Sequence, residues 1–443
     1  MSLEKKNIAI VGAGLVGSLL SIYFSKKGYK VTVFEGRGDM RKDSIHAGRS
    51  INLALSNRGR KALRKVSLED KILSISVPVE KRLMHSVDNK LTEQYYGKKN
   101  QAIYSVPRRE LNCMLMDLAE KDGVKIFFKK KCIDVDFENT ILKFDESENL
   151  KFDFVFAADG AGSIIRKKMN KFSDFDMTSK FIDCGYKELT IPTDNNGDWQ
   201  ISPDALHIWP RSSYMVMALP NLDKTFTCTL FFPIKGENSF ENLNSEQDVN
   251  DFFNKNCPDL VPLIPDITEQ YLNNPVSPLG IIRCSPWRKN NFMLIGDSCH
   301  ATVPFYGQGM NCGFEDCDLI VDFFDKSFGG IDFNSSIDIF LKNRKINTDA
   351  MQDLSMHNFI VMRDKTGDKQ FLLQKKIEAL FTKKHPSKWT PLYSMVTFSH
   401  IDYNEALQIG KKQEKIMQEI MQIENIDSIW DSELIEKKIL SFL

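Results

Sequence analysis

Apolar and polar positions over the first 35 residues predict a strand, a helix and a second strand. Asn7–Val11 is a short apolar run rich in β-branched residues, typical of a buried strand. Leu15–Lys27 has its apolar residues at helical spacing, and Gly28 follows as a C-cap. Lys30–Phe34 is a second short apolar run. The chain therefore begins with a strand–helix–strand unit.

The turn between this first strand and the helix has glycines in the order G-x-G-x-x-G, and the second strand ends on an acid. Gly12 permits a tight turn, Gly14 lets the backbone approach a pyrophosphate, and Gly17 lets the helix pack against the strand. The helix N-terminus presents N–H groups and a positive dipole end to phosphates. Glu35 can accept hydrogen bonds from ribose hydroxyls. The unit predicts a dinucleotide site without separating FAD from NAD.

A polar, basic loop over residues 36–49 follows this unit and leads into a predicted strand at Ser50–Leu55. Arg49 and Arg58 can be solvated charges or contacts to the dinucleotide, and the sequence leaves both interpretations open.

The region after residue 80 predicts a β-hairpin and then a helix. Lys81–Tyr96 alternates in hydrophobicity and is interrupted by Asp88-Asn89. The next helix is expected to have Pro107 at its first position, with Arg108 and Arg109 in its first turn. Cations are unfavourable at the positive end of a helix dipole. Either a nearby phosphate or a solvated basic turn would account for these two arginines.

The middle of the chain changes from α/β alternation to a β-rich pattern. Phe154–Ala158 is a predicted strand that ends in an Asp159-Gly160 turn, a ligand-facing feature of doubly wound sheets. From Phe181 to about Arg283 short apolar runs follow one another without the earlier helices. We expect a separate mixed or antiparallel sheet that covers the first domain.

A second strand, turn and helix come after residue 290. Asn291–Ile295 is a buried strand, and Asp297 in the turn after it is placed to accept hydrogen bonds from sugar-chain hydroxyls. Pro304, Gly307 and Gly309 make a loop whose backbone can approach a ring closely. The helix that follows points its N-terminus at this loop, where its dipole would stabilise negative charge on a reduced isoalloxazine.

Composition restricts the remaining classes of protein. Lys plus Arg and Asp plus Glu are both 59, which argues against a nucleic-acid binder held by net charge. Nine cysteines without C-x-x-C pairs favour reduced thiols over disulfides or a zinc site, so no metal is expected. No signal peptide and no apolar run of membrane-spanning length is visible, and residues 411–443 indicate amphipathic helices.

These motifs together resemble the single-component flavin-dependent aromatic hydroxylases, over residues 7–325. The resemblance is closer to one branch, which hydroxylates L-kynurenine at ring position 3 in tryptophan catabolism. It implies FAD as cofactor, NADPH and O2 as co-substrates, and a C4a-hydroperoxyflavin as the oxygenating species. The stretches that carry the closer match are Gly48–Ser56, Leu206–Arg211, Phe226–Phe231, Val303–Asn311, Asp353–Asn358 and Pro391–Ser399.

The resemblance also implies which residues form the site. In the matching enzymes an arginine and a tyrosine of the hairpin bind the amino-acid carboxylate, and they correspond to Arg82 and Tyr96. No side chain is expected to act as a catalyst beyond the flavin, and Pro304 is expected in the pocket wall. The other expected substrate contacts are Asn358, Tyr393, Phe305, Gln308 and Met362. The expected FAD contacts are Gly12, Gly14, Gly17, Glu35, Arg37, Ala54, Arg108, Asp297, Met310 and Asn311.

The predicted architecture is α/β: a Rossmann-like FAD-binding domain, a β-sheet substrate domain and a C-terminal helical region. The predicted boundaries are 1–180 and 286–330 for the FAD-binding domain, 181–285 for the substrate domain with hairpin 81–97 contributing, and 331–443 for the helices. Mammalian members of the resembled branch end in a hydrophobic anchor that this chain lacks, so a soluble, bacterial-type, cytoplasmic form is expected. A homodimer is compatible with this, and the oligomeric state stays open.

Other functions account for the sequence less completely. A sister hydroxylase acting on another aromatic acid is the main alternative. A flavoprotein serving only as a binding scaffold is disfavoured by the intact Gly296-Asp297 and Gly307–Gly309 turns. A flavin halogenase would carry a Trp-x-Trp-x-Ile-Pro motif, which is absent, and a plain NAD dehydrogenase leaves the second turn unexplained.

Overall fold

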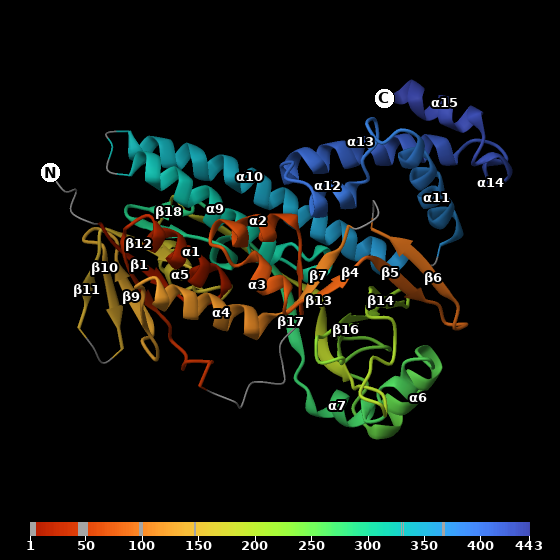
Figure 1. Cartoon of the computed structure of the whole chain (residues 1–443), viewed down its shortest axis with the longest axis horizontal. Helices are drawn as coiled ribbons and strands as arrows, with labels where there is room; N and C mark the ends of the chain where they lie inside the picture. The colour runs from red at the N-terminus through yellow and green to blue at the C-terminus, as the bar shows by residue number, and fades with distance from the viewer. Residues whose placement is uncertain are drawn as a thin grey trace. The chain divides into compact units, whose positions relative to one another are not determined.

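The computed structural model describes residues 6–42, 52–96, 101–145, 148–328, 330, 332–365 and 368–443. Arg49 and the last residue of hairpin 81–97 lie outside these ranges. The chain divides into two compact units. Unit 1 comprises 1–77, 104–182 and 278–352, and unit 2 comprises 78–103, 183–277 and 353–443. The ribbon is shown in Figure 1.

Unit 1 is built on a six-stranded sheet in the order β18-β19-β12-β1-β2-β8. All its neighbouring strands are parallel except β18 and β19. β1 lies between β2, the next strand in sequence, and β12, which comes much later. Ligands of such sheets bind at this switch of strand order, outside the carboxyl ends of the strands. The strands are β1 Asn7–Val11, β2 Lys30–Phe34, β8 Lys125–Phe127, β12 Phe154–Ala157, β18 Arg288–Lys289 and β19 Phe292–Leu294.

Helices of unit 1 pack around this sheet, where α1 contacts both α4 and α9, and α9 contacts α2. Ile8, Ile10 and Phe156 are completely buried in the core between sheet and helices. The helices are α1 Leu15–Lys26, α2 Asn57–Lys65, α3 Glu69–Leu73, α4 Arg108–Lys121, α5 Ile164–Met169, α8 Asp297–His300, α9 Gly309–Ser327 and α10 Phe333–Ile360, which runs on into unit 2. Two small sheets, β11-β10-β9 and β3-β7-β4, consist of β3 Asn52–Leu55, β4 Val77–Val79, β7 Ile103–Pro107, β9 Cys132–Asp136, β10 Ile141–Phe144 and β11 Leu150–Lys151.

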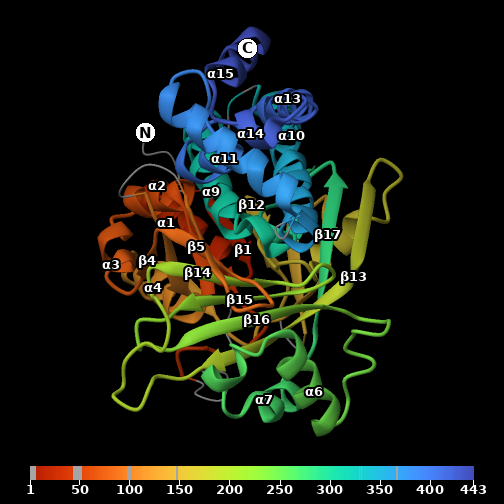
Figure 2. The ribbon, with the colours of Figure 1, turned by 90° about the vertical axis from the view of Figure 1, so that its right-hand side faces the viewer.

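Unit 2 contains most of a seven-stranded sheet in the order β17-β13-β16-β15-β14-β5-β6. The β5–β6 hairpin is antiparallel, and β5 joins β14 in parallel. Figure 2 shows α6 and α7 on one side of β14–β16, where Trp209, Phe226 and Phe253 are fully buried. The strands are β5 Lys81–His85, β6 Leu91–Tyr95, β13 Asp176–Ile191, β14 Ala205–Pro210, β15 Met215–Pro220, β16 Phe226–Pro233 and β17 Ser277–Ser285.

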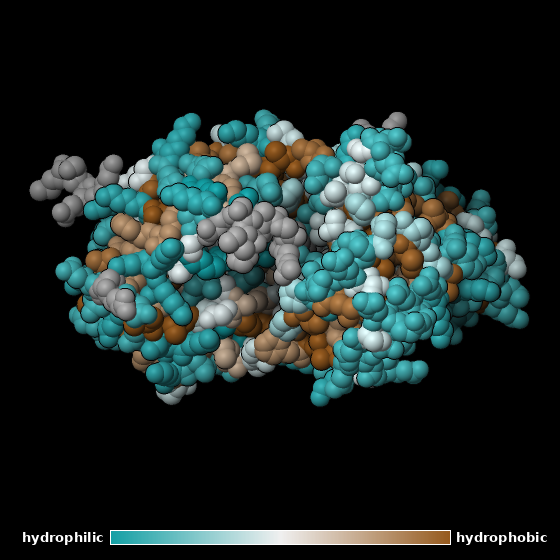
Figure 3. Space-filling model, turned by 90° about the horizontal axis from the view of Figure 1, so that it is seen from below, coloured by the Kyte–Doolittle hydropathy of each residue, from teal (hydrophilic) through white to brown (hydrophobic). Residues whose placement is uncertain are grey.

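The C-terminal helices of unit 2 form a cluster of their own. Trp389, Met417 and Ile420 are among the buried residues of its core. In the described residues no helix is long and apolar enough to cross a membrane. The face in Figure 3 is mostly hydrophilic with hydrophobic areas interspersed. The helices of unit 2 are α6 Glu246–Asn256, α7 Ile267–Asn273, α11 Lys369–Lys384, α12 Leu392–Phe398, α13 Tyr403–Met421, α14 Ile426–Ile429 and α15 Glu433–Phe442.

The predicted α/β class with a separate sheet and a helical C-terminal region is confirmed, but two local predictions are wrong. Pro107 ends strand β7, and α4 begins one residue later at Arg108. Pro107 has φ −63° and ψ 120°, an extended conformation that precedes the helix instead of opening it. The β-rich region also contains α6 and α7, whose amphipathic faces cover the sheet.

Candidate active site

The glycine turn after β1 has the close contacts that a dinucleotide site requires. Gly12 has φ +105°, and a Cβ on it would lie 2.4 Å from the carbonyl oxygen of Ala158. A Cβ on Gly17 would lie 2.0 Å from the carbonyl oxygen of Gly12. Apart from Gly14 itself and its two chain neighbours, no heavy atom lies within 4 Å of where a Cβ on Gly14 would stand. Helix α1 begins at the next residue, so an open backbone lies directly before a helix N-terminus, as phosphate binding requires.

Glu35 directly follows β2 beside this turn, and its carboxylate is buried. Its Oε2 accepts from the backbone N–H of Ala13 at 3.0 Å, and its Oε1 accepts from the backbone N–H and Nε of Arg37, both at 2.9 Å. Burial alone would raise the pKa of Glu35, but the bonds from Arg37 and Ala13 outweigh burial and lower the pKa. The group is therefore an ionised acceptor at the position where a ribose would bind.

Helix α4 is connected to the glycine turn by Asn112, a residue that sequence reasoning missed. Asn112 Nδ2 donates to the carbonyl oxygen of Ala13 at 3.1 Å, and the buried Oδ1 has no partner. A buried acceptor without a donor costs free energy, so a ligand hydroxyl that donates to Asn112 Oδ1 would bind favourably here. Arg108, at the first position of α4, is exposed, whereas Arg109 donates to the carbonyl oxygen of Met40 at 2.6 Å.

The two acidic turns after β12 and β19 are joined by hydrogen bonds. Ser298 Oγ donates to Asp159 Oδ1 at 3.1 Å and accepts from the N–H of Gly160 at 3.0 Å. Arg166 donates to the carbonyl oxygen of Ser298 at 2.7 Å. Burial raises the pKa of Asp159. Asp297, beside Ser298, is exposed at the first position of α8, so its carboxylate is accessible to a ligand.

Asn311, in the first turn of α9, holds three backbone segments together. Its Nδ2 donates to the carbonyl oxygens of Ala54 at 2.8 Å and Gly307 at 2.7 Å, and its Oδ1 accepts from the N–H of Ser56 at 2.9 Å. Gly307 has φ +65°, and a Cβ on it would meet the Cβ of Ala54 at 3.0 Å. This side chain therefore fixes the loop before α9 against β3.

The loop that Asn311 holds carries the other predicted residues of unit 1. Phe305 and Gln308 are buried, while Pro304 and Met310 are half-buried. The apolar side chains give this loop a largely water-excluding character.

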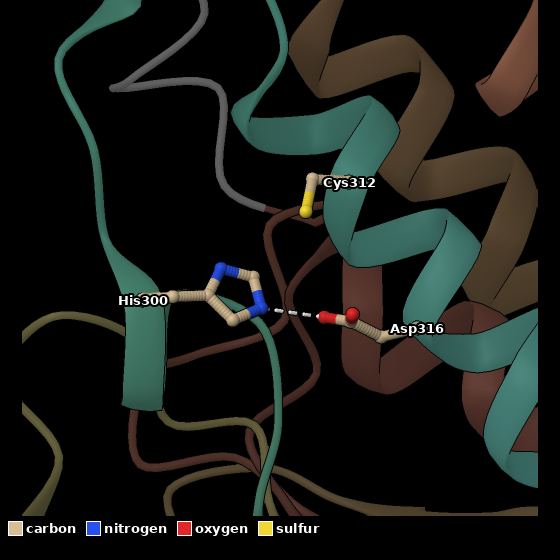
Figure 4. Close-up of side chains that lie close together, drawn as sticks. All are labelled: His300, Cys312 and Asp316. Carbon is tan, nitrogen blue, oxygen red and sulfur yellow. Dashed lines mark hydrogen bonds and ion pairs between the residues drawn. The ribbon is translucent and has the colours of Figure 1, made fainter. Parts of the chain in front are cut away.

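Unit 1 also contains a buried ion network, and Figure 4 shows its His300–Asp316 pair together with Cys312. His300 Nε2 donates to Asp316 Oδ2 at 2.6 Å, and Arg344 Nε donates to Asp316 Oδ1 at 2.8 Å. Arg344 also donates to Glu315 at 2.7 Å, and Arg58 donates to the other oxygen of Glu315 at 2.5 Å. The network connects α2, α8, α9 and α10.

His300, Cys312 and Asp316 are close enough together to be considered as metal ligands. Arg344 contacts two of them, because its Nη2 lies 3.4 Å from the sulfur of Cys312. Burial raises the pKa of the Cys312 thiol well above its usual value, which keeps the sulfur protonated. A guanidinium next to a protonated thiol opposes a second cation. The cluster is an ion-pair network and not a metal centre.

Unit 2 holds the predicted carboxylate-binding residues in one cluster. The Arg82 guanidinium carbon lies 4.4 Å from the ring centre of Tyr393 and 5.3 Å from that of Tyr96. The two rings are stacked, with centres 4.9 Å apart and an interplanar angle of 16°. Ser394 donates to the carbonyl oxygen of Tyr96 at 3.3 Å, which connects α12 to the hairpin. The two tyrosine rings orient the arginine, and a planar guanidinium is the donor geometry that suits a carboxylate.

Asn358 and Met362 lie one turn apart where α10 passes into the π-helical turn η4, Val361–Lys365. Both side chains are buried, and Asn358 Nδ2 lies 3.2 Å from the sulfur of Met362. π-helical turns inside α-helices are frequent at functional sites. Of the predicted substrate residues, unit 2 therefore contains Arg82, Tyr96, Tyr393, Asn358 and Met362, and unit 1 contains Pro304, Phe305 and Gln308.

Comparisons with known proteins give the family of the chain. The FAD binding domain family matches residues 5–324. A kynurenine 3-monooxygenase of Flavobacterium johnsoniae is 48% identical over 442 residues, which is 98% of each chain. The chain belongs to the kynurenine 3-monooxygenase family. The family's enzyme from Myxococcus xanthus is 40% identical over 99% of this chain and 97% of its own, and that from Sus scrofa is 41% identical over 94% and 88%.

Solved structures show the same fold at low identity. The tetrameric form of 2-methyl-3-hydroxypyridine-5-carboxylic acid oxygenase is 18% identical, with a TM-score of 0.68 over 82% of this chain and 94% of that one. A Klebsiella pneumoniae HpxO variant complexed with FAD is 15% identical, with a TM-score of 0.66 over 97% and 100%. The resemblance to FAD-dependent aromatic hydroxylases expected from the sequence motifs is confirmed. Membership in the family makes the chain an FAD-dependent aromatic monooxygenase.

Proposed function

We propose that the protein hydroxylates L-kynurenine at ring position 3, with NADPH and O2 as co-substrates and FAD as cofactor. The observation that carries the proposal is the Arg82 guanidinium beside the stacked rings of Tyr96 and Tyr393, in a chain related end to end to kynurenine 3-monooxygenases. An arginine fork binds an amino-acid carboxylate with two parallel hydrogen bonds, so this cluster would orient the substrate.

We assign the FAD site to unit 1. The open backbone at Gly14 would take the pyrophosphate, and Glu35 the ribose hydroxyls. Asp297 would accept from the sugar chain, and Asn311 would fix the loop beside the ring. The full proposed set is Gly12, Gly14, Gly17, Glu35, Arg37, Ala54, Arg108, Asp297, Met310 and Asn311. FAD bound by these residues would accept a hydride from NADPH and activate O2 for transfer of one oxygen atom, and no side chain is assigned a nucleophilic role.

The protein's own part in the reaction is positioning and the exclusion of water. The apolar wall around the substrate would consist of Pro304, Phe305 and Met362. The polar contacts to the substrate would come from Gln308, Asn358 and Tyr393. An apolar wall that excludes water would suppress the loss of the activated oxygen as hydrogen peroxide. The ring of L-kynurenine is electron-rich because of its ortho-amino group, so correct placement is sufficient for transfer to ring carbon 3.

The domain division is proposed on the same basis: 1–180 and 286–330 for FAD, 181–285 with hairpin 81–97 for substrate, and 331–443 as helices. A cytoplasmic location is supported by the thiols, since all nine cysteines are free and eight of them are buried. Reduced thiols are typical of reducing compartments.

The test is NADPH oxidation by the purified, FAD-loaded protein with a panel of aromatic acids. L-kynurenine should stimulate oxidation, whereas benzoate, anthranilate and L-tryptophan should not support hydroxylation. Stimulation and hydroxylation with a different acid but not with L-kynurenine would assign the protein to a sister hydroxylase.

A further inference from the structure

Unit 2 contains a cavity that belongs to none of the proposed FAD or kynurenine contacts. Its volume is about 560 Å3, which lies within the usual range for small-molecule pockets. It is lined by the β5–β6 hairpin, the turn between β14 and β15, the end of α6, and Leu372 of α11. The lining residues are Met84, Ser86, Val87, Thr92, Gln94, Pro210, Arg211, Ser212, Ser213, Tyr214, Asn238, Asn256 and Leu372.

Arg211 is the only charged residue in this lining, and it is 8% exposed. Its Nη1 donates to the carbonyl oxygens of His85 and Pro210, both at 2.8 Å, and its Nε donates to the carbonyl oxygen of Asn256. The buried Nη2 has no hydrogen-bond partner. Among the residues that the structure describes, no carboxylate forms an ion pair with this arginine.

Two acidic groups near Arg211 and the cavity, Asp259 and Asp88, have other partners. Asp259 accepts from His85 at 2.7 Å and from Trp209 at 2.9 Å. Asp88 is paired with Lys90 at 2.6 Å.

Cys257, which also interacts with Arg211, stays a neutral thiol because burial raises its pKa to about 12. A buried cation without a counter-ion is costly, so the positive charge of Arg211 favours an anion in the cavity beside it.

We propose that this cavity binds a small organic anion that has a carboxylate and an apolar body. The carboxylate would be attracted by Arg211 and would meet hydroxyl and amide groups of the lining, which contains no acid. The apolar body would pack against Met84, Val87, Pro210 and Leu372. The site is distinct from the proposed kynurenine contacts, since Arg82 is absent from the lining. The two are adjacent on β5, where Met84 is two residues from Arg82.

Benzoate is a suitable probe, with benzamide as its neutral isostere, and titration calorimetry measures binding to the FAD-loaded protein. We expect benzoate to bind and benzamide to bind at least about tenfold more weakly, since a charge-assisted contact is lost. Saturating L-kynurenine should leave benzoate binding unchanged, and Arg82→Ala should leave it unchanged as well.

Two variants locate the site. Arg211→Gln should weaken benzoate by about tenfold or more, with folding checked by circular dichroism. Leu372→Trp reduces the cavity volume without touching the hydrogen bonds of Arg211, and it should also abolish binding. Lys376→Trp, one turn along α11 from Leu372, exposed and absent from the lining, is the matched control and should bind normally. The proposal is overturned if benzoate does not bind, if L-kynurenine or Arg82→Ala removes it, or if Leu372→Trp binds it normally.

Discussion

Arg344 is the residue on which the buried network of unit 1 depends most. Arg344→Met keeps much of the side-chain volume and removes the charge. The guanidinium is 6% exposed and contacts Glu315 at 2.7 Å, Asp316 at 2.8 Å and the carbonyl oxygen of Cys312 at 3.1 Å. The substitution therefore removes one cationic hydrogen-bond donor from each of the two buried carboxylates, Glu315 and Asp316.

Breaking a buried ion pair by removing one partner costs about 3–5 kcal/mol. Asp316 keeps its bond from His300, and Glu315 keeps its bond from Arg58, so the lower end of this range is expected. A loss of about 3 kcal/mol corresponds to a decrease of roughly 6–12 °C in the melting temperature of a domain of this size.

Lys345→Met is the matched control, because it removes one positive charge from the next position of α10. Lys345 pairs with Asp349 at 2.5 Å, and both side chains are partly exposed, so an effect of about 0.5 kcal/mol or less is expected. Urea unfolding followed by circular dichroism measures both variants. An unfolding midpoint of Arg344→Met no lower than that of Lys345→Met would refute the reasoning.

Three further predictions concern cofactor, substrate and pH. Arg82→Ala should raise the KM for L-kynurenine by about 100-fold, through loss of a charge-assisted contact, with FAD still bound; steady-state kinetics with an unchanged KM would contradict this. Gly17→Ala should lower the melting temperature, because its Cβ would meet the Gly12 carbonyl oxygen at 2.0 Å. Gly14→Ala should fold normally and bind FAD more weakly in fluorescence titrations. An equal decrease in melting temperature for the two variants would contradict this. Burial alone would raise the pKa of Asp316, but its neighbours lower it to about 2 from 3.8. The stability that Asp316 contributes, measured as the difference in unfolding free energy from Asp316→Asn, should be constant above about pH 4 and decrease toward pH 2; a contribution that rises on acidification would contradict this.

Local patterns made the first unit of the fold predictable from sequence. Asn7–Val11 and Lys30–Phe34 are strands with the expected bounds, because short β-branched runs between glycines leave few alternatives. Hairpin Lys81–Tyr96 was likewise indicated by alternation and a polar turn. The start of α4 was misplaced, since a proline fits both the end of a strand and the beginning of a helix.

Contacts between distant parts of the chain were not predictable in the same way. The ring of Tyr393 lies on Arg82 although about three hundred residues separate them, and only the family resemblance suggested both. The sequence does not indicate that Arg344 is buried in an ion network, because an arginine in an amphipathic helix is usually solvated. Asn112 was also missed, since its role depends on a backbone oxygen of another segment.

The central claim is that this chain transfers one oxygen atom from O2 to the ring of L-kynurenine. The most direct measurement is mass spectrometry of the product formed by the FAD-loaded protein with NADPH, L-kynurenine and 18O2. The account predicts a product that carries one 18O atom at ring position 3, with NADPH consumed in step with product. NADPH consumption that yields hydrogen peroxide and unmodified L-kynurenine, or a product without 18O, would contradict it.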